Sequence, residues 1–335
     1  CALMVFCGCG KNNAAQHYES GWAAMGKKDY TTAVNEFQQV IDQNSRLAES
    51  YRAEGIAYYS EKAYPEAIAA FSRSLNNMDD PDKEFKKDVQ FYLAQARMDY
   101  GEVDKAIEVY SEILKAGEDE QAFFLRGKAY ISMEDYKNAE KDFQRALEGC
   151  EDYNLYINIY QIYVDHNKAV DGDAYLKMAL ELEPQDGEDC YHRGRIYEYE
   201  KNYEAARDEL KTAMEQGYED AMLLLGRVYL EMEDPASARS MYQEYLQKSE
   251  QGAKAYNGLA MCDIYDGAYD SALENIAQGL KENSKEDEQG LLYNEIVAYE
   301  YKRDFATAKE KMKIYLEQYP EDEAALRENE FLSTR

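Results

Sequence analysis

Apolar residues recur every three or four positions in two short stretches between residues 120 and 147, and polar residues fill the positions between them. Phe123, Gly127 and Tyr130 follow this spacing in the first stretch, and Ala139 and Phe143 follow it in the second. Such spacing places the apolar side chains on one face of an α-helix. A short polar turn separates the two stretches. The pattern therefore predicts a helical hairpin whose apolar face needs a neighbour to cover it.

The same pattern returns along the chain. Gly21, Tyr30, Ala33 and Phe37 stand at offsets of 0, 9, 12 and 16, and later copies keep these offsets. The small residue at the third offset recurs at steps of 34, 39, 33, 33, 34, 32, 34 and 36. It is found at Ala33, Ala67, Ala106, Ala139, Gly172, Ala206, Ala238, Ala272 and Ala308. Because stacked copies bury the faces that single copies cannot, we expect an array of nine hairpins. We call each hairpin with its turn a unit and number the units one to nine along the chain.

The irregular steps and the end of the array carry their own predictions. The step of 39 predicts a loop insertion at residues 79–82, and the step of 36 predicts a charged loop around residues 281–287. The last residues, 321–335, are polar but contain Ala324, Ala325 and Leu326. They predict a capping helix, since the terminal unit of a repeat array needs a polar outer face.

These residues resemble the tetratricopeptide repeat, whose pattern runs W-x2-L-G-x2-Y, then A-x3-F and a final P. The resemblance covers almost the whole chain. It implies an all-α fold, a right-handed α-solenoid of about nine helical hairpins with a C-terminal capping helix. Unit five departs most, with Tyr160 at the Gly position, and unit seven has Pro235 at the Tyr position. Units three, eight and nine replace the Gly by Ala94, Ala260 and Ile296.

In this family the first helix of each hairpin lines a concave groove, with the second, fifth, ninth and twelfth positions facing it. Here the fifth positions of units three to seven are apolar or aromatic, and three ninth positions are basic. The resemblance thus implies a groove for a protein or an extended peptide, with apolar anchors beside cations that bind a carboxylate. The implied site consists of Phe91, Phe124, Lys128, Ile157, Tyr191, Arg195, Leu223 and Arg227.

Two qualifications apply to this groove. The same side chains could instead pack against the next helix, as a tight superhelix requires. The Lys/Asn carboxylate clamp of chaperone-binding relatives is missing, because the ninth position is never Asn and the fifth positions are mostly apolar. This departure disfavours binding to the carboxyl termini of chaperones.

Charge narrows the class of partner. The chain has 38 Lys and Arg against 67 Asp and Glu, a net charge of −29. Such a charge repels nucleic acid and anionic lipid surfaces, so neither is an expected partner of the array. It fits a basic partner, and it also fits the ordinary solvation of an acidic surface.

The amino-terminal residues turn from apolar to polar within a few positions. The residues before Lys11 resemble the end of a bacterial lipoprotein signal, in which an apolar run leads to a small residue and an acceptor Cys. Gly8 precedes Cys9, which makes Cys9 the predicted lipidation site, whereas Cys7 follows the bulky Phe6. Phe6 stands where Leu is usual, and Cys7 also departs from the pattern. The alternatives are a frayed apolar tail and the end of a transmembrane segment.

Candidate chemistry is sparse. The three histidines, His17, His166 and His192, lie in no known catalytic motif, and no Cys/His group has the spacing of a metal site. We expect His166 in a solvated turn and His192 in a structural role near Arg195. Three later cysteines are expected to be buried and reduced: Cys150, Cys190 and Cys262. The sequence predicts neither catalysis, nor a cofactor, nor a metal.

Taken together, these features predict three segments: an anchor at residues 1–13, the array at 14–320 and a cap at 321–335. The predicted function is a non-catalytic scaffold that binds proteins or peptides, anchored by lipid to a bacterial cell envelope and facing outside the cytoplasm. One alternative is a cytosolic adaptor. Another is an envelope factor that presents a substrate or binds a glycan, since Tyr-rich faces stack on sugars.

Overall fold

The computed structural model describes residues 9–78, 82–249 and 251–335. In these ranges the chain is built from α-helices and short turns, and no described residue lies in a β-strand. The helices are α1 (Cys9–Gly26), α2 (Tyr30–Asp42), α3 (Leu47–Ser60), α4 (Tyr64–Asn76), α5 (Lys83–Tyr100), α6 (Val103–Ala116), α7 (Glu120–Ser132), α8 (Tyr136–Ala146), α9 (Tyr153–Asp165), α10 (Ala169–Leu180), α11 (Gly187–Tyr199), α12 (Tyr203–Glu215), α13 (Ala221–Glu231), α14 (Pro235–Lys248), α15 (Ala253–Tyr265), α16 (Tyr269–Lys281), α17 (Lys285–Tyr301), α18 (Phe305–Gln318) and α19 (Glu323–Ser333).

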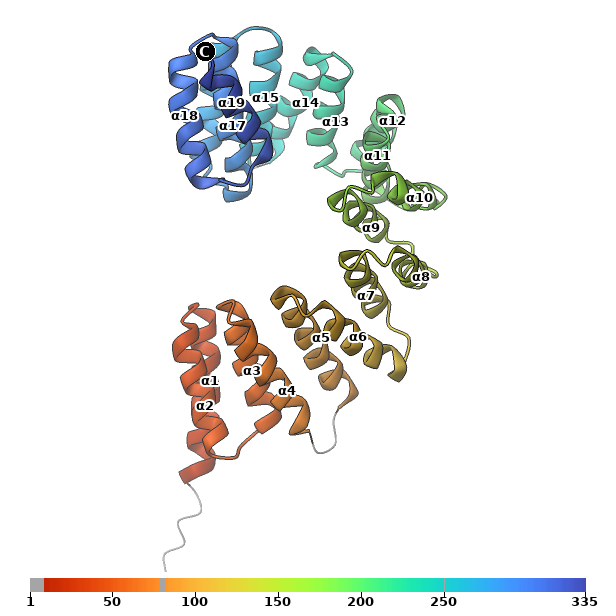
Figure 1. Cartoon of the computed structure of the whole chain (residues 1–335). Helices are drawn as coiled ribbons and strands as arrows, with labels where there is room; N and C mark the ends of the chain where they lie inside the picture. The colour runs from red at the N-terminus through yellow and green to blue at the C-terminus, as the bar shows by residue number, and fades with distance from the viewer. Residues whose placement is uncertain (1–8, 79–81, 250) are drawn as a thin grey trace, which may run out of the picture. The chain divides into compact units, whose positions relative to one another are not determined.

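Consecutive helices pair into hairpins (Figure 1). We call the first helix of each hairpin the A helix (odd numbers, α1 to α17) and the second the B helix (even numbers, α2 to α18). B helices also contact the next A helix, as α2 contacts α3 and α4 contacts α5, so neighbouring hairpins stack. The remaining helix, α19, packs on α18. The predicted all-α solenoid of nine hairpins with a C-terminal capping helix is therefore confirmed for the described residues.

By its packing the chain divides into two compact units, Cys1–Asp173 and Ala174–Arg335, which we describe separately. Fully buried aromatic rings lie at the centre of the first compact unit, among them Phe37, Phe71 and Tyr110. Successive clusters of buried side chains form the core of the second compact unit, around Leu210, Tyr242, Ile276 and Met312. Burying one such side chain stabilises the fold by roughly 1.5–3 kcal/mol.

Five hairpins are closed by a glycine of the A helix that faces a large side chain sixteen residues later on the B helix. A Cβ atom added to Gly127 would lie 2.7 Å from the ring of Phe143, too close for a real contact. The ring thus occupies the space that a larger residue on the A helix would need. The glycine therefore lets the two helices approach closely. The five pairs are Gly21–Phe37, Gly55–Phe71, Gly127–Phe143, Gly194–Leu210 and Gly226–Tyr242.

Unit five keeps the hairpin although its A-helix position is large, because the small position on the B helix is reduced from alanine to glycine. Tyr160 occupies the A-helix position that is glycine in those five units, and Gly172 occupies the B-helix position that is usually alanine. A Cβ atom on Gly172 would lie 3.1 Å from the Tyr160 ring and 2.9 Å from Cβ of Tyr163. The missing Cβ atom of Gly172 therefore makes room for Tyr160. This compensation explains how the unit keeps the hairpin while it departs from the sequence pattern.

The turns between A and B helices share one conformation. Each contains a residue with a left-handed backbone, five positions before the recurrent small residue of the B helix: Lys28, Lys62, Gly101, Glu134, Asn167, Lys201, Glu233, Gly267 and Arg303. The next residue is often an Asp or Asn whose side chain accepts a hydrogen bond from the first turn of the B helix, as Asp135 does from the backbone N–H of Asn138. In unit seven the first residue of α14 is Pro235, a position where proline is well tolerated.

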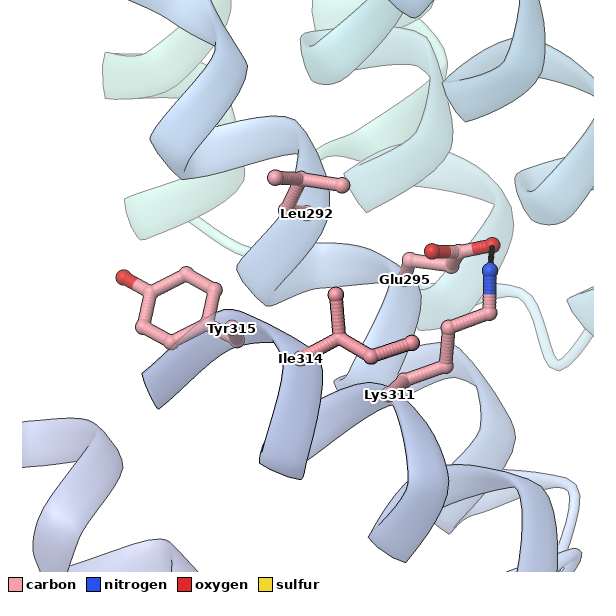
Figure 2. A pocket seen from close by; sticks show the side chains of 5 residues that line it. All are labelled: Leu292, Glu295, Lys311, Ile314 and Tyr315. Carbon is pink, nitrogen blue, oxygen red and sulfur yellow. Dashed lines mark ion pairs between the residues drawn. The ribbon is translucent and has the colours of Figure 1, made fainter. Parts of the chain in front are cut away.

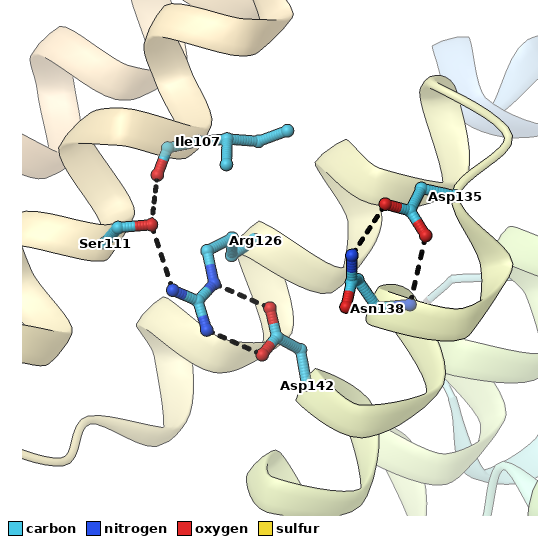
Figure 3. Close-up of polar contacts among 6 residues, drawn as sticks. All are labelled: Ile107, Ser111, Arg126, Asp135, Asn138 and Asp142. Atoms are coloured by element: carbon cyan, nitrogen blue, oxygen red, sulfur yellow. Dashed lines mark hydrogen bonds and ion pairs between the residues drawn. The ribbon is translucent and has the colours of Figure 1, made fainter.

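One repeated position beside the core carries ion pairs. Arg126 of α7 donates two hydrogen bonds to Asp142 of α8, at 2.7 and 2.8 Å. It also donates to Oγ of Ser111 on α6 at 2.9 Å, and Ser111 in turn donates to the carbonyl of Ile107 (Figure 3). Arg126 therefore joins two neighbouring hairpins. The equivalent positions hold Arg193–Glu209 at 2.8 Å and, with the charges reversed, Glu295–Lys311 at 2.7 Å.

The prediction of a charged loop around residues 281–287 is wrong, because helical residues occupy most of this range. α16 ends at Lys281, and α17 already begins at Lys285. Three acidic residues stand in the first turn of α17, where carboxylates stabilise the positive end of the helix dipole. The extra residues lengthen an A helix instead of a loop. The loop expected at 79–82 lies outside the described residues except for Asp82, which caps α5.

The amino-terminal predictions fall mostly outside the described part of the chain. Residues 1–8 are not described, and α1 begins at Cys9, whose side chain is not described either. The lipidation of Cys9 and the anchor at 1–13 remain predictions. Among the described residues, no helix combines the length and the apolar composition needed to cross a bilayer.

Candidate functional site

All eight predicted site residues lie on A helices, and we call the side of the A helices that carries them the A-helix face. Two sets result, because the first four residues belong to the first compact unit and the last four to the second. The first set is Phe91 on α5, Phe124 and Lys128 on α7, and Ile157 on α9. The second set is Tyr191 and Arg195 on α11, and Leu223 and Arg227 on α13.

In the first set, the aromatic side chains also help to close their own hairpins. The rings of Phe91 and Tyr110 are 6.3 Å apart, and those of Phe124 and Phe143 are 6.1 Å apart. Phe91 and Phe124 are half-buried, so part of each ring stays accessible. Ile157 is only 2% exposed and belongs to the core. Ile157 therefore packs inside the array instead of lining a groove, whereas the two phenylalanines both pack against the core and remain partly exposed to solvent.

The second set is organised around Tyr191. Its ring lies 4.9 Å from the ring of Tyr218, and the guanidinium of Arg195 lies 5.9 Å from its centroid. Burial raises the pKa of Tyr191, while the positive charges of Arg195, Arg227 and Lys254 oppose that rise in its pKa. Three cations from three successive A helices, α11, α13 and α15, thus act on one half-buried tyrosine. We call Tyr191, Arg195, Arg227 and Lys254 the basic–aromatic cluster.

Lys254 was not among the predicted site residues. It stands at the second position of unit eight, one of the positions that the family resemblance directs to the groove. A comparison of all cations at those positions, in place of the ninth positions alone, would have found it. Its ammonium group is 3.1 Å from a carboxylate oxygen of Glu286, and this hydrogen bond is the main cause of the raised pKa of Lys254.

Carboxylates balance the cations of the cluster. Arg227 is more than half exposed and donates to Glu198 at 2.6 Å, and Glu198 itself is 14% exposed. Asp220 opens α13 and is close enough to raise the pKa of Tyr191. Leu223 is half-buried and packs against the cluster of buried residues around Tyr242. The face thus offers an apolar surface next to cations that already bind carboxylates.

The described histidines have structural surroundings. His17 is 2.7 Å from Glu36, and Nδ1 of the exposed His166 is 2.8 Å from the carbonyl of Ile162. His192 is 5% exposed, and its Nδ1 lies 3.3 Å from Arg195. Among the described residues no three His, Cys, Asp or Glu side chains are grouped so that they could hold a metal ion.

The later cysteines are free thiols, as predicted. Cys190 and Cys262 are buried, and burial raises the pKa of Cys262 to about 11, so this thiol is inert at neutral pH. Cys150 is only half-buried, so the prediction of burial is wrong for this residue. The reason is local: Cys150 follows the end of α8 and lies in the connection to α9, outside the packed helices.

A small cavity of about 70 Å³ lies on the last hairpin, lined by Leu292, Glu295, Lys311, Ile314 and Tyr315 (Figure 2). The first two residues come from α17 and the others from α18, and the Glu295–Lys311 ion pair stands on one side of it. Its volume is too small for a cofactor. It is separate from the basic–aromatic cluster.

Two models of the tetratricopeptide repeat match the sequence, one at residues 18–82, 191–253 and 223–288 and the other at residues 120–152. Together they cover more than half of the chain. The chain belongs to the tetratricopeptide-repeat (TPR) family. TPR repeats generally serve as scaffolds for protein interactions and not as catalysts, and none of the curated proteins matches this TPR chain.

Solved TPR structures resemble the chain at low identity. A TPR protein from Parabacteroides merdae ATCC 43184 is 16% identical, with 85% of this chain and 99% of that chain covered and a TM-score of 0.46. YrrB, described as a TPR protein with an unusual peptide-binding site, is 26% identical over 56% of this chain and 97% of its own, with a TM-score of 0.36. The structure of pilF from Pseudomonas aeruginosa is 18% identical, with 64% of this chain and 97% of that chain covered and a TM-score of 0.42.

Proposed function

We propose that this TPR protein is a lipid-anchored scaffold of the bacterial cell envelope that binds extended segments of partner proteins on its A-helix face. The observation that carries the binding part is the basic–aromatic cluster, in which Arg195 lies 5.9 Å from the ring of the half-buried Tyr191 and the charges of Arg227 and Lys254 also act on this tyrosine. In a chain with a net charge of −29, a cluster in which three carboxylates only balance three cations is locally less acidic than the chain as a whole.

The chemistry of the cluster favours a peptide that carries both an apolar and a carboxylate side chain. Tyr191 and Leu223 are half-buried, so they offer apolar area while their positions are fixed by packing. The exposed guanidinium of Arg227 has five N–H donors and uses one of them for Glu198, so it can bind a ligand carboxylate while it keeps Glu198. Such a contact adds specificity without breaking the existing ion pair, and Glu198 is not left unpaired.

The binding proposal is tested by selecting ligands for the full chain from a library of random twelve-residue peptides. We expect enriched peptides to contain an Asp, a Glu or a free carboxyl terminus next to an apolar residue. Replacing Tyr191 by Ala together with Arg227→Ala should weaken their affinity by at least roughly tenfold, since buried anchors and ion pairs are each worth about 1–3 kcal/mol.

A matched control is available on a B helix. Arg207 of α12 is also an arginine paired with a carboxylate, Asp208, but it lies away from the A-helix face. Arg207→Ala should leave the affinity unchanged. If Arg207→Ala weakens binding as much as Arg227→Ala does, the A-helix face is not the binding site. If no peptide is enriched, the peptide-binding proposal fails.

The anchoring proposal rests on the residues before Cys9, and it is tested separately. The full-length gene is expressed in a bacterium that is fed a labelled fatty acid. Label on the protein that survives Cys7→Ser but disappears with Cys9→Ser supports a lipidated Cys9. An unlabelled protein in the soluble fraction contradicts the anchor and supports the cytosolic adaptor instead.

A further inference from the structure

The capping helix α19 is held in place by apolar contacts and one polar anchor. Ala325 and Leu332 are fully buried in a cluster with Met312 and Tyr315 of α18. Asp322 caps α19 and accepts a hydrogen bond from the hydroxyl of Tyr315 at 2.6 Å. These contacts cover the apolar side of the last hairpin, which would otherwise face solvent.

One contact of α19 has an unfavourable charge. Oε1 of Glu300, at the end of α17, is buried and finds no hydrogen-bond donor. The group beside it is the carboxyl of Glu328 on α19, and the two carboxyls are within hydrogen-bond reach. Two carboxylates have only acceptor atoms, so a hydrogen bond between them requires a proton on one of them. Burial and the negative charge of Glu328 raise the pKa of Glu300 to about 7.

We propose that Glu300 and Glu328 form a proton-controlled latch between the last hairpin and α19. With one proton shared between the two carboxyls, the latch is closed and α19 stays docked. When that proton is lost to solvent, two negative charges face each other at a partly buried contact, and α19 is released. Release uncovers Met312 and Tyr315, so the latch controls access to the apolar end of the array.

The other titratable groups around the pair keep their charge state over the relevant range of pH. The hydrogen bond from Tyr315 lowers the pKa of Asp322 below its usual value, so Asp322 remains ionised. Burial raises the pKa of Tyr315 to about 12 and also raises the pKa of Tyr293, so both phenols remain protonated. Arg327 of α19 forms an ion pair with Glu323 at 3.5 Å. The carboxyl pair is therefore the group that titrates.

The sign of the pH dependence follows from the raised pKa of Glu300. Its pKa is higher in the docked state than in the released state, where it returns towards its ordinary value near 4.5. Docking is then fully favoured below that ordinary pKa, and the advantage is lost as the pH rises through about 7. The latch is closed in mild acid and open in mild alkali.

The test is amide hydrogen exchange on the full chain between pH 5 and pH 8, expressed as protection relative to the intrinsic rate. We expect the protection of α19 to fall by roughly 10- to 100-fold over this range. The hairpin of α7 and α8 serves as an internal reference whose protection should change little. Glu328→Gln supplies an amide donor to Glu300 and should hold the protection of α19 constant within about threefold.

Two further variants make the result decisive. Glu300→Gln should flatten the pH dependence in the same way, and Glu330→Gln, on an exposed residue of the same helix, should leave it as in the parent. The proposal is overturned if the protection of α19 does not depend on pH in the parent. It is also overturned if Glu328→Gln keeps the full dependence, which remains measurable even if Glu300→Gln does not fold.

Discussion

At the scale of the residue, the fold depends on pairs of positions and not on single residues. Gly127 has to be small because the ring of Phe143 fills the space beside it. The sequence shows that both residues recur at a fixed spacing, and the structure shows that they contact each other. The sequence could not predict the compensation in unit five, where Gly172 makes room for Tyr160, because the spacing of a repeat does not show which side chains meet.

This account of the glycine predicts a large effect from one methyl group. Gly127→Ala should destabilise the protein by about 1–3 kcal/mol, because the new Cβ must displace a fully buried ring. Gly290→Ala is the matched control: it lies inside α17, its nearest neighbour would be 3.4 Å away, and alanine favours the helix by roughly 0.5–1 kcal/mol. Urea unfolding of both variants measures the difference. Equal stabilities for the two variants would contradict the proposed close approach.

At the scale of the element, neighbouring helices are joined by side chains that the periodic pattern does not encode. Arg126 bridges α7 to both α8 and α6. The corresponding pair in unit seven is apolar, Leu225 and Met241, so the position tolerates either chemistry. The periodic pattern marks only the neighbouring positions, those of Gly127 and Phe143. It did not predict the ion pairs, because both charged residues also fit a solvated helix surface.

Breaking this pair on one side should therefore cost more than replacing it completely. Arg126→Leu leaves Asp142 buried without its partner and should cost about 3 kcal/mol. The double variant Arg126→Leu with Asp142→Met copies unit seven and should recover most of that loss. Arg327→Ala removes an exposed pair and should change stability by less than about 0.5 kcal/mol. The midpoints of denaturant unfolding of the parent and the three variants measure these differences in stability. A double variant no more stable than Arg126→Leu alone would rule out this explanation.

At the scale of the whole molecule, the regular step of the repeat was sufficient to predict the number of hairpins and the capping helix. The same regularity predicts that the A helices line the groove, but it does not predict which of their side chains are accessible to solvent. Ile157 is in the core, whereas Tyr191 is half-buried and feels the charges of cations on α11, α13 and α15. Burial and through-space charge depend on neighbouring hairpins, and a pattern read one hairpin at a time does not contain them.

The central claim, that partners bind on the A-helix face, is tested most directly by photocrosslinking in living source cells. A photoreactive amino acid replaces Met261, which is 37% exposed at the ninth position of unit eight on α15, or Ser240, which is exposed on the B helix α14. We expect a discrete crosslinked partner from position 261 and none from position 240, and the crosslink should disappear when Tyr191→Ala and Arg227→Ala are combined. Crosslinks from position 240 alone would place the partner on the B helices and contradict the claim.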